Sequence, residues 1–170
     1  PKPQNPTKAD KIYLLIIMEK GEHYAIPNAH PLEIGLSWDF NGEEIDLDAT
    51  VVLINDVGSI ADAVYYNQLV SKCGAITHSG DCKDGKRDGF NEKIDIDLHK
   101  VNFEVSYLAV LVSSYQGVGF KNIETATVST MQDGAKINDV YLGAVRSEVN
   151  NTVLASIIYK KSGQWHIYNS

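Results

Sequence analysis

The sequence predicts an all-β fold, a two-sheet β-sandwich whose acidic loops cluster at one end. The chain contains about ten short segments that are either apolar throughout or alternate between apolar and polar residues. Turn dipeptides separate several of them, among them Asn41-Gly42, Asp133-Gly134 and Ser162-Gly163. Helical periodicity is scarce, which favours packed sheets over a parallel α/β architecture.

The N-terminal part divides into a tail and the first strands. Residues 1–10 include three prolines and are interpreted as a proline-rich linker or tail, so we expect the domain to span residues 11–170. Ile12–Met18 is a continuous apolar run, typical of a strand buried on both faces, and His23–Ile26 is a shorter candidate strand. From Leu32 to Trp38 apolar and polar residues alternate, which predicts a strand with one buried face.

The middle of the chain also consists of expected strands separated by turns. Asn41-Gly42 is a hairpin-type turn that leads to a strand over Ile45–Asn55. Asp62–Val70 is interpreted as a strand followed by a turn, and its tyrosines as core or sheet-face side chains. Ile94–Leu98 alternates again. Further strands are expected at Tyr107–Val112, Lys121–Met131, Asn138–Ala144, Thr152–Lys160 and Gln164–Tyr168.

Acidic side chains gather at the start of the strand over Ile45–Asn55. Asp46 and Asp48 are two residues apart, so the period of a strand places both carboxylates on one face, about 7 Å apart at the backbone. Asp39 ends the preceding strand, and across the expected hairpin it lies close to both. Three carboxylates at one end of a sheet predict a cation site.

The stretch from His78 to Leu98 is a second acidic segment, a glycine-rich loop that runs into an alternating strand. Its glycines allow the tight or left-handed backbone that wrapping an ion requires. Carboxylate and amide oxygens are the ligands that calcium prefers. The candidate ligands of this loop are Asp81, Asp84, Asp88, Asn91 and Glu92.

We expect the two acidic segments to face each other in one site, because a hard dication relieves the repulsion of clustered carboxylates most directly. Salt bridging is the structural alternative, since Lys83, Lys86 and Arg87 lie in the same loop. For catalysis, His78 beside Asp81 offers a base with an orienting acid. No nucleophile elbow, phosphate-binding loop or HExxH motif accompanies this pair, so the chain is not expected to be an enzyme.

Charge and cysteine content limit the partners and the compartment. The net charge of −7 argues against nucleic acid, because no basic patch is available to neutralise phosphates. Cys73 and Cys82 are interpreted as free thiols in a reducing compartment. With no secretory leader and an apolar run over Ile12–Met18 that is too short to cross a bilayer, a cytoplasmic protein is expected.

Four stretches, in the same order along the chain, resemble the TerD family of tellurium-resistance and stress-associated calcium-binding domains. They are GLSWD at 35–39, DLDAT at 46–50, DAVYYN at 62–67, and HSGD at 78–81 continuing to Leu98. A fainter likeness follows at GFKN, residues 119–122, and at GQW, residues 163–165. The resemblance therefore covers roughly residues 12–168 and is most specific between 35 and 98.

The resemblance implies a β-sandwich whose acidic loops bind Ca²⁺ and that has no catalytic chemistry of its own. The ligands carried over by motif are Asp39, Asp46, Asp48, Asn67, Asp81, Asp88, Asn91 and Glu92. Family loops read almost purely Asp, Gly, Asn and Thr, whereas this loop also carries Cys82, Lys83, Lys86, Arg87 and Phe90. The added cations subtract charge from the site, and calcium affinity depends on ligand charge.

Two functions follow as expectations. The first is a calcium-binding stress-response or signalling module whose ordered loops engage a protein partner, further domains of a longer chain, or the surface of an anionic membrane. The alternative is a β-sandwich interaction domain with a degenerate calcium site closed by internal salt bridges.

Overall fold

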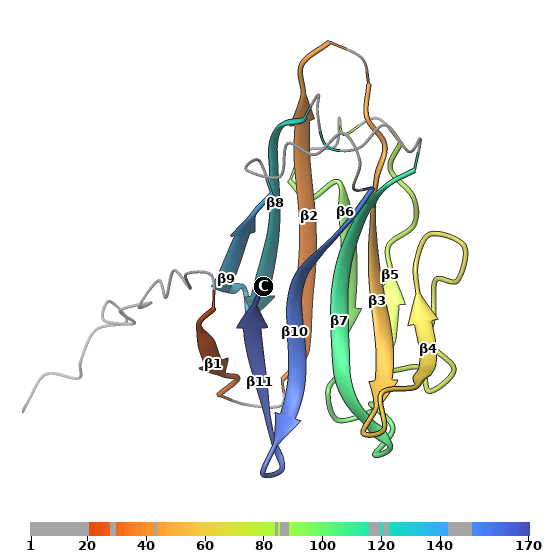
Figure 1. The fold of residues 1–170 in the computed structure, drawn as a ribbon, viewed down its shortest axis with the longest axis vertical. Coiled ribbons are helices and arrows are strands. Elements are labelled where there is room, and N and C mark those ends of the chain that lie inside the picture. The colour runs from red at the N-terminus through yellow and green to blue at the C-terminus, as the bar shows by residue number, and fades with distance from the viewer. Residues whose placement is uncertain are drawn as a thin grey trace, which may run out of the picture.

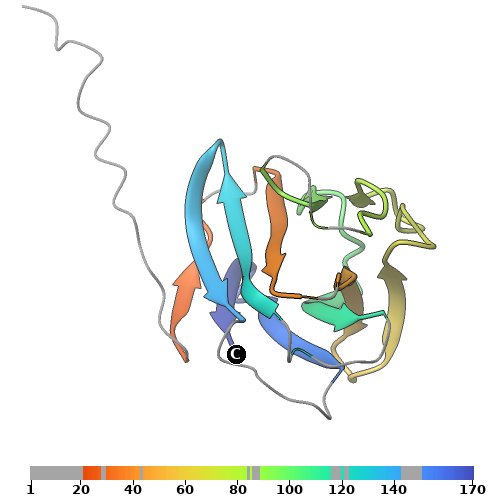
Figure 2. The same cartoon turned by 90° about the horizontal axis from the view of Figure 1, so that it is seen from above.

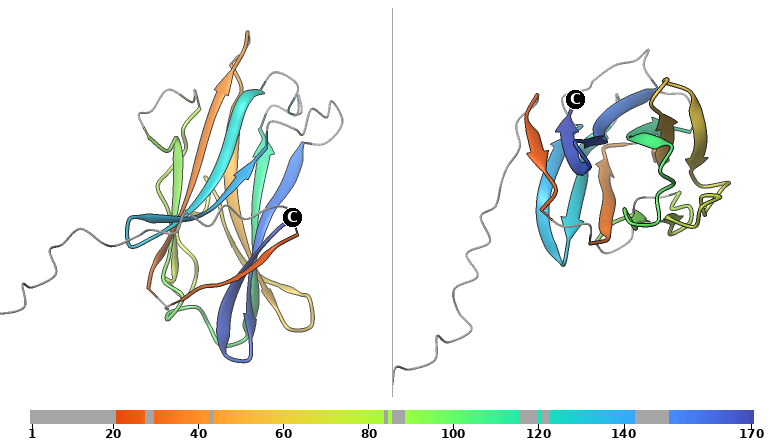
Figure 3. Two further views of the ribbon diagram at one scale, coloured as in Figure 1. Left: turned by 90° about the vertical axis from the view of Figure 1, so that its left-hand side faces the viewer. Right: turned by 90° about the horizontal axis from the view of Figure 1, so that it is seen from below.

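The computed structural model describes residues 21–27, 30–42, 44–83, 85, 89–115, 120, 123–142 and 151–170. It confirms the all-β sandwich, with two antiparallel sheets of six and five strands that face each other (Figure 1 and Figure 3). The proline-rich tail and the strand expected at Ile12–Met18 lie outside the described residues. Within those residues no helix is long and apolar enough to cross a membrane.

The larger sheet has the strand order β1-β11-β10-β7-β3-β4. Its strands are β1 His23–Ala25, β3 Leu47–Asn55, β4 Ile60–Val64, β7 Val105–Ser114, β10 Thr152–Lys161 and β11 Gln164–Asn169. At its centre, Val51 of β3 lies opposite Val110 of β7, and Leu53 opposite Leu108. All four side chains are buried, so this part of the sheet turns an apolar face toward the other layer.

The smaller sheet has the strand order β5-β6-β2-β8-β9. Its strands are β2 Leu32–Phe40, β5 Ile76–His78, β6 Glu92–Ile96, β8 Ile123–Gln132 and β9 Ala135–Tyr141. The alternation expected in β2 is confirmed, because Leu32, Ile34, Leu36 and Trp38 are buried. Gly35 lies directly under the Phe90 ring, where an added Cβ would come within 2.3 Å of the ring carbons. The loop before β6, which carries Phe90, thus packs on the outer face of β2.

The expected hairpin between the second and third strands is wrong. β2 pairs with β6 and β8, whereas β3 pairs with β4 and β7 in the other sheet. The connection crosses the end of the sandwich because Ile45 is a core residue, whose carbonyl accepts a hydrogen bond from Trp38 Nε1 at 2.9 Å. Asn41-Gly42 therefore begins a crossover between the two layers.

Smaller differences concern the short strands. β5, Ile76–His78, was not among the expected strands, but its backbone pairs with β6. β9 begins at Ala135, directly after the Asp133-Gly134 turn, and ends at Tyr141. The segment from Asp62 contains the end of β4 and then a turn closed by the Tyr65↔Gln68 bridge, as expected.

Two acidic segments lie at the same end of the sandwich, the upper end in Figure 1. One is the connection that leads into β3, and the other is the loop between β5 and β6. Figure 2 looks down onto this end. The packed sheets therefore bring together parts of the chain that are about 35 residues apart in sequence.

Candidate metal site

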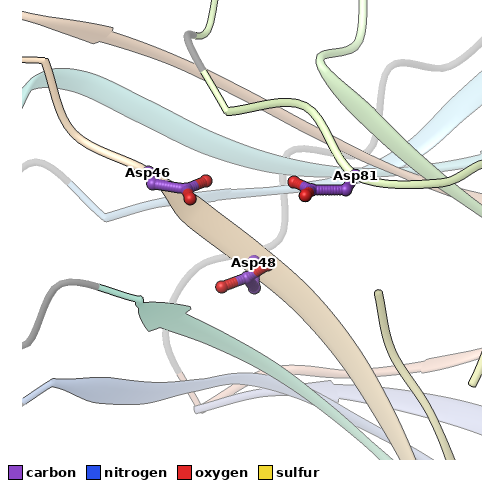
Figure 4. A group of neighbouring side chains, drawn as sticks. All are labelled: Asp46, Asp48 and Asp81. Carbon is purple, nitrogen blue, oxygen red and sulfur yellow. The ribbon is translucent and has the colours of Figure 1, made fainter. Parts of the chain in front are cut away.

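Three aspartates from two segments meet at this end. Asp46 lies just before β3, Asp48 is in β3, and Asp81 follows β5. One carboxylate oxygen of each lies within 4.8 Å of the other two. Figure 4 shows the carboxylates of Asp46 and Asp81 facing each other, with Asp48 beside them. Asp46 is 8% exposed and Asp48 4%, so two of the three are buried acids.

Burial and mutual repulsion change the protonation of this group. Burial raises the pKa of Asp48 to about 7, and the charges of Glu92, Asp46 and Asp81 add to the effect. Burial likewise raises the pKa of Asp46 to about 6, with further contributions from Asp81 and Glu92. Without a cation, the site therefore favours protons on its carboxylates, and a cation among them would favour the ionised forms instead.

A cavity of about 90 Å³ adjoins the three aspartates and is also lined by Tyr66, Lys83 and Tyr115. Tyr66 follows β4 and Tyr115 follows β7, and their rings lie edge to face with centroids 5.7 Å apart. Lys83 Nζ is 3.7 Å from Asp81 Oδ2, and the lysine side chain is 78% exposed. The walls of the cavity thus combine carboxylates with two aromatic rings and one ammonium group.

Glu92 connects the two segments that carry the aspartates. The Ala49 N–H, directly after Asp48, donates to Glu92 Oε2 at 2.8 Å. The Cys82 N–H, directly after Asp81, donates to Glu92 Oε1 at 3.2 Å. The Glu92 side chain is fully buried, and each of its oxygens accepts a backbone hydrogen bond. Glu92 thus links the start of β3 to the acidic loop through two backbone hydrogen bonds, and its predicted role as a metal ligand stays a prediction.

His78 is fully buried against Glu92, with its Nε2 3.3 Å from Glu92 Oε2. The Gly80 N–H donates to His78 Nδ1 at 2.9 Å. Nδ1 is thus the acceptor nitrogen of this ring, and the ring proton resides on Nε2, facing the glutamate. The imidazole forms part of the buried frame of the site and is not exposed to solvent.

The other predicted ligands have different surroundings. Asn91 Oδ1 accepts a hydrogen bond from the Trp38 N–H at 2.9 Å, and Asp39 Oδ2 accepts one from the Thr125 hydroxyl at 3.0 Å. Asn67 is exposed in the turn after β4. Asp84 and Asp88 lie outside the residues that the structure describes, as do Lys86 and Arg87.

Sequence reasoning did not find the aromatic part of the site. Tyr66 was expected in the core or on a sheet face, and Tyr115 was not singled out. The pairing of Leu47 with Ser114 brings the end of β7 to the start of β3, and the Tyr115 N–H donates to the Asp46 carbonyl at 3.1 Å. Only this strand pairing could have indicated that Tyr115 adjoins the acids, because the two residues are far apart in sequence.

The three aspartates fit a hard cation. Oxygens that bind Ca²⁺ at 2.3–2.6 Å lie at most about 5 Å apart, so three oxygens within 4.8 Å of one another can share one ion. Asp46 Oδ1 is buried and accepts no hydrogen bond from the described residues. A donor set made of carboxylates suits calcium or magnesium better than a soft transition metal.

Comparison with known proteins gives consistent matches. The TerD domain model matches residues 14–169. Tellurium resistance protein TerZ of Serratia marcescens is 32% identical over 146 residues, which cover 79% of this chain and 75% of TerZ. General stress protein 16U of Bacillus subtilis is 24% identical and matches 89% of this chain and 87% of its own. A solved structure described as a homologue of telluride resistance protein (TerD), SCO6318 from Streptomyces coelicolor, has a TM-score of 0.71 with 16% identity, covering 83% of this chain and 88% of its own.

Proposed function

The chain belongs to the TerD domain family, and we propose that it is a calcium-binding module of a stress or tellurium-resistance response, without catalysis. The biological context is taken from curated relatives, which are named tellurium resistance and general stress proteins. We place the protein in the cytoplasm, in keeping with free thiols at Cys73 and Cys82.

One observation carries the calcium proposal, namely the convergence of Asp46, Asp48 and Asp81 around a buried oxygen, Asp46 Oδ1, that accepts no hydrogen bond from the described residues. Burying a carboxylate oxygen without a donor is costly, and a bound dication would remove that cost. The backbone N–H groups of Ala49 and Cys82, which directly follow Asp48 and Asp81, donate to Glu92 and not to these aspartates. Among the described residues, Asp46 and Asp48 form no ion pair that would compete with a cation.

Calcium would act by ordering. It would join the start of β3, which carries Asp46 and Asp48, to the loop that carries Asp81. Repulsion among the three carboxylates opposes this arrangement when no cation is present. Binding would therefore stabilise the loop and present its surface to a partner.

The surroundings of His78 support a role without catalysis. A general base must reach the proton that it removes, and His78 is fully buried with its two nitrogens next to Gly80 and Glu92. We assign this histidine to the support of Glu92.

One contact favours the second candidate, a salt-bridged interaction domain. Lys83 Nζ lies 3.7 Å from Asp81 Oδ2 and competes with a cation for that carboxylate. The lysine is largely exposed, where an ion pair contributes little free energy. We therefore expect Lys83→Gln to raise calcium affinity moderately, by less than about tenfold.

Isothermal titration calorimetry of the chelator-treated protein with calcium, together with melting curves in calcium and in chelator, tests the proposal. A calcium concentration of 100 times Kd stabilises a one-site protein by about 2.7 kcal/mol, which corresponds to several degrees in Tm for a domain of this size. We expect Asp48→Asn to lose most of the heat and of the Tm increase.

The matched control is Asp95→Asn, which removes a more exposed carboxylate from β6 and should retain both responses. Absence of heat and of a Tm change in the wild-type protein would refute the calcium proposal. Equal responses in wild type and Asp48→Asn would place the ion elsewhere on the chain.

A further inference from the structure

We propose that the three aspartates also receive the ammonium group of a lysine from a partner protein, with Tyr66 and Tyr115 packing against the aliphatic part of that side chain. Calcium and the partner would then occupy the same carboxylates and exclude each other. This exclusion rests on the proposed calcium function, whereas lysine binding itself does not.

The geometry of the carboxylates suits an ammonium group. A lysine Nζ has three N–H donors in tetrahedral directions, and hydrogen bonds of about 2.8 Å place their acceptors about 4.6 Å apart. One oxygen from each of Asp46, Asp48 and Asp81 lies within 4.8 Å of the other two. Asp46 Oδ1 is buried without a donor from the described residues, and its residue is more than nine-tenths buried. Each donor of the ammonium thus finds one carboxylate.

The same cavity offers apolar walls for a side chain that carries such a group. Tyr66 is 38% exposed and Tyr115 63%, and both line the cavity together with the three aspartates. Tyr65 extends this aromatic surface, with its ring 5.5 Å from that of Tyr66. A lysine buries its methylene chain along apolar surface and keeps its ammonium at the polar end, which matches this order of groups. Tyrosine rings also attract cations.

Lysine fits better than arginine. The guanidinium group is a planar fork that pairs with one carboxylate through two parallel bonds, whereas three converging aspartates call for a compact donor. A cavity of about 90 Å³ suits the smaller group. Lys83 of this chain reaches only the outermost carboxylate, at 3.7 Å from Asp81, with most of its side chain in solvent. Among the described residues, no ion pair is formed by Asp46 or Asp48.

The test is fluorescence anisotropy with the full chain in chelator at about 0.15 M salt, where nonspecific attraction is largely screened. The probe is a labelled peptide of four Gly-Ser-Lys repeats, and the control peptide has every lysine acetylated at Nε. We expect the lysine peptide to bind at least tenfold more tightly than the acetylated one, and saturating calcium to displace it. Tyr115→Ala should weaken binding about threefold or more, with the exposed Tyr141→Ala as the matched control.

The outcomes separate the two proposals. If calcium binds but the lysine peptide binds no better than its acetylated form, or is unaffected by Tyr115→Ala and by calcium, the lysine inference is wrong and the calcium proposal stands. If the peptide binds as expected but calorimetry detects no calcium, the calcium proposal fails and the docking of lysine is retained. Calcium-dependent binding to phosphatidylserine vesicles without lysine recognition would indicate a membrane surface as the partner and overturn the inference.

Discussion

Raising the pH of the calcium-free protein from 5 to 8 should destabilise the fold. The reason is that burial raises the pKa of Asp48 to about 7 and that of Asp46 to about 6, from an ordinary value of 3.8. Between 3.8 and the raised values, the folded protein holds protons that the unfolded chain has released. The free energy of unfolding therefore falls as the pH rises through this window and is level above about pH 7.

The magnitude follows from the same values. Between pH 5 and pH 8, release of the Asp48 proton lowers the free energy of unfolding by on the order of 3 kcal/mol. Release of the Asp46 proton lowers it by on the order of 1 kcal/mol. A loss of this size lowers the Tm of such a domain by roughly 10 °C. Desolvation raises the pKa of Asp62, but several hydrogen bonds together outweigh it and the net shift is downward; the pKa of Asp97 is lowered mainly by its hydrogen bond with Lys100, so both groups titrate below this window.

Differential scanning calorimetry in chelator at several pH values measures this slope. Asp48→Asn removes the larger of the two titrating groups, so the melting curves of this variant should depend much less on pH, while Asp95→Asn should follow the wild type. Saturating calcium should reverse the trend, because the ion binds only the ionised carboxylates and competes with protons. A wild-type Tm that is constant or rises from pH 5 to pH 8 in chelator would refute the reasoning.

Two further substitutions test the frame around the site. Glu92→Gln replaces one backbone-accepting oxygen by an NH₂ donor that faces an N–H group, so we expect a loss of about 1–3 kcal/mol in urea unfolding and a weaker calcium affinity. The same change at the partly exposed Glu33 should leave both nearly unchanged. Gly35→Ala should cost about 1–3 kcal/mol because its Cβ meets the Phe90 ring, and Phe90→Ala in the same chain should relieve that clash; equal losses with and without Phe90→Ala would contradict this contact.

The sequence was sufficient for the fold class because most of the longer strands have their own local signal. The alternation from Leu32 to Trp38 and the apolar run of β3 need no knowledge of their neighbours. Strand pairing carries no such local signal, and the turn at Asn41-Gly42 suggested a hairpin that the structure does not contain. What decides the crossover is the burial of Ile45 at the end of the sandwich, which depends on both sheets being present.

Part of the candidate site could likewise be predicted from the sequence, and part of it could not. Asp46 and Asp48 could be placed together from the period of a strand, and Asp81 from the acidic composition of its loop. The roles of Glu92 and Tyr115 could not be predicted, because they depend on which backbone groups and strand ends meet in space. The sequence alone does not indicate that Glu92 accepts backbone hydrogen bonds from both segments, because that contact depends on how the segments pack.

The position of Glu92 also explains how three carboxylates can be held together in the absence of a cation. Its oxygens accept hydrogen bonds from the N–H groups that directly follow Asp48 and Asp81, so one buried side chain fixes the spacing of both aspartate-bearing segments. Charge-assisted hydrogen bonds of this kind are strong enough to oppose repulsion between neighbouring acids. Calcium binding then has to order less of the loop, so its entropic cost is smaller and the calcium affinity is higher. On this reasoning, Glu92→Gln should weaken calcium binding without changing its stoichiometry, whereas Asp48→Asn removes a ligand and should abolish the site.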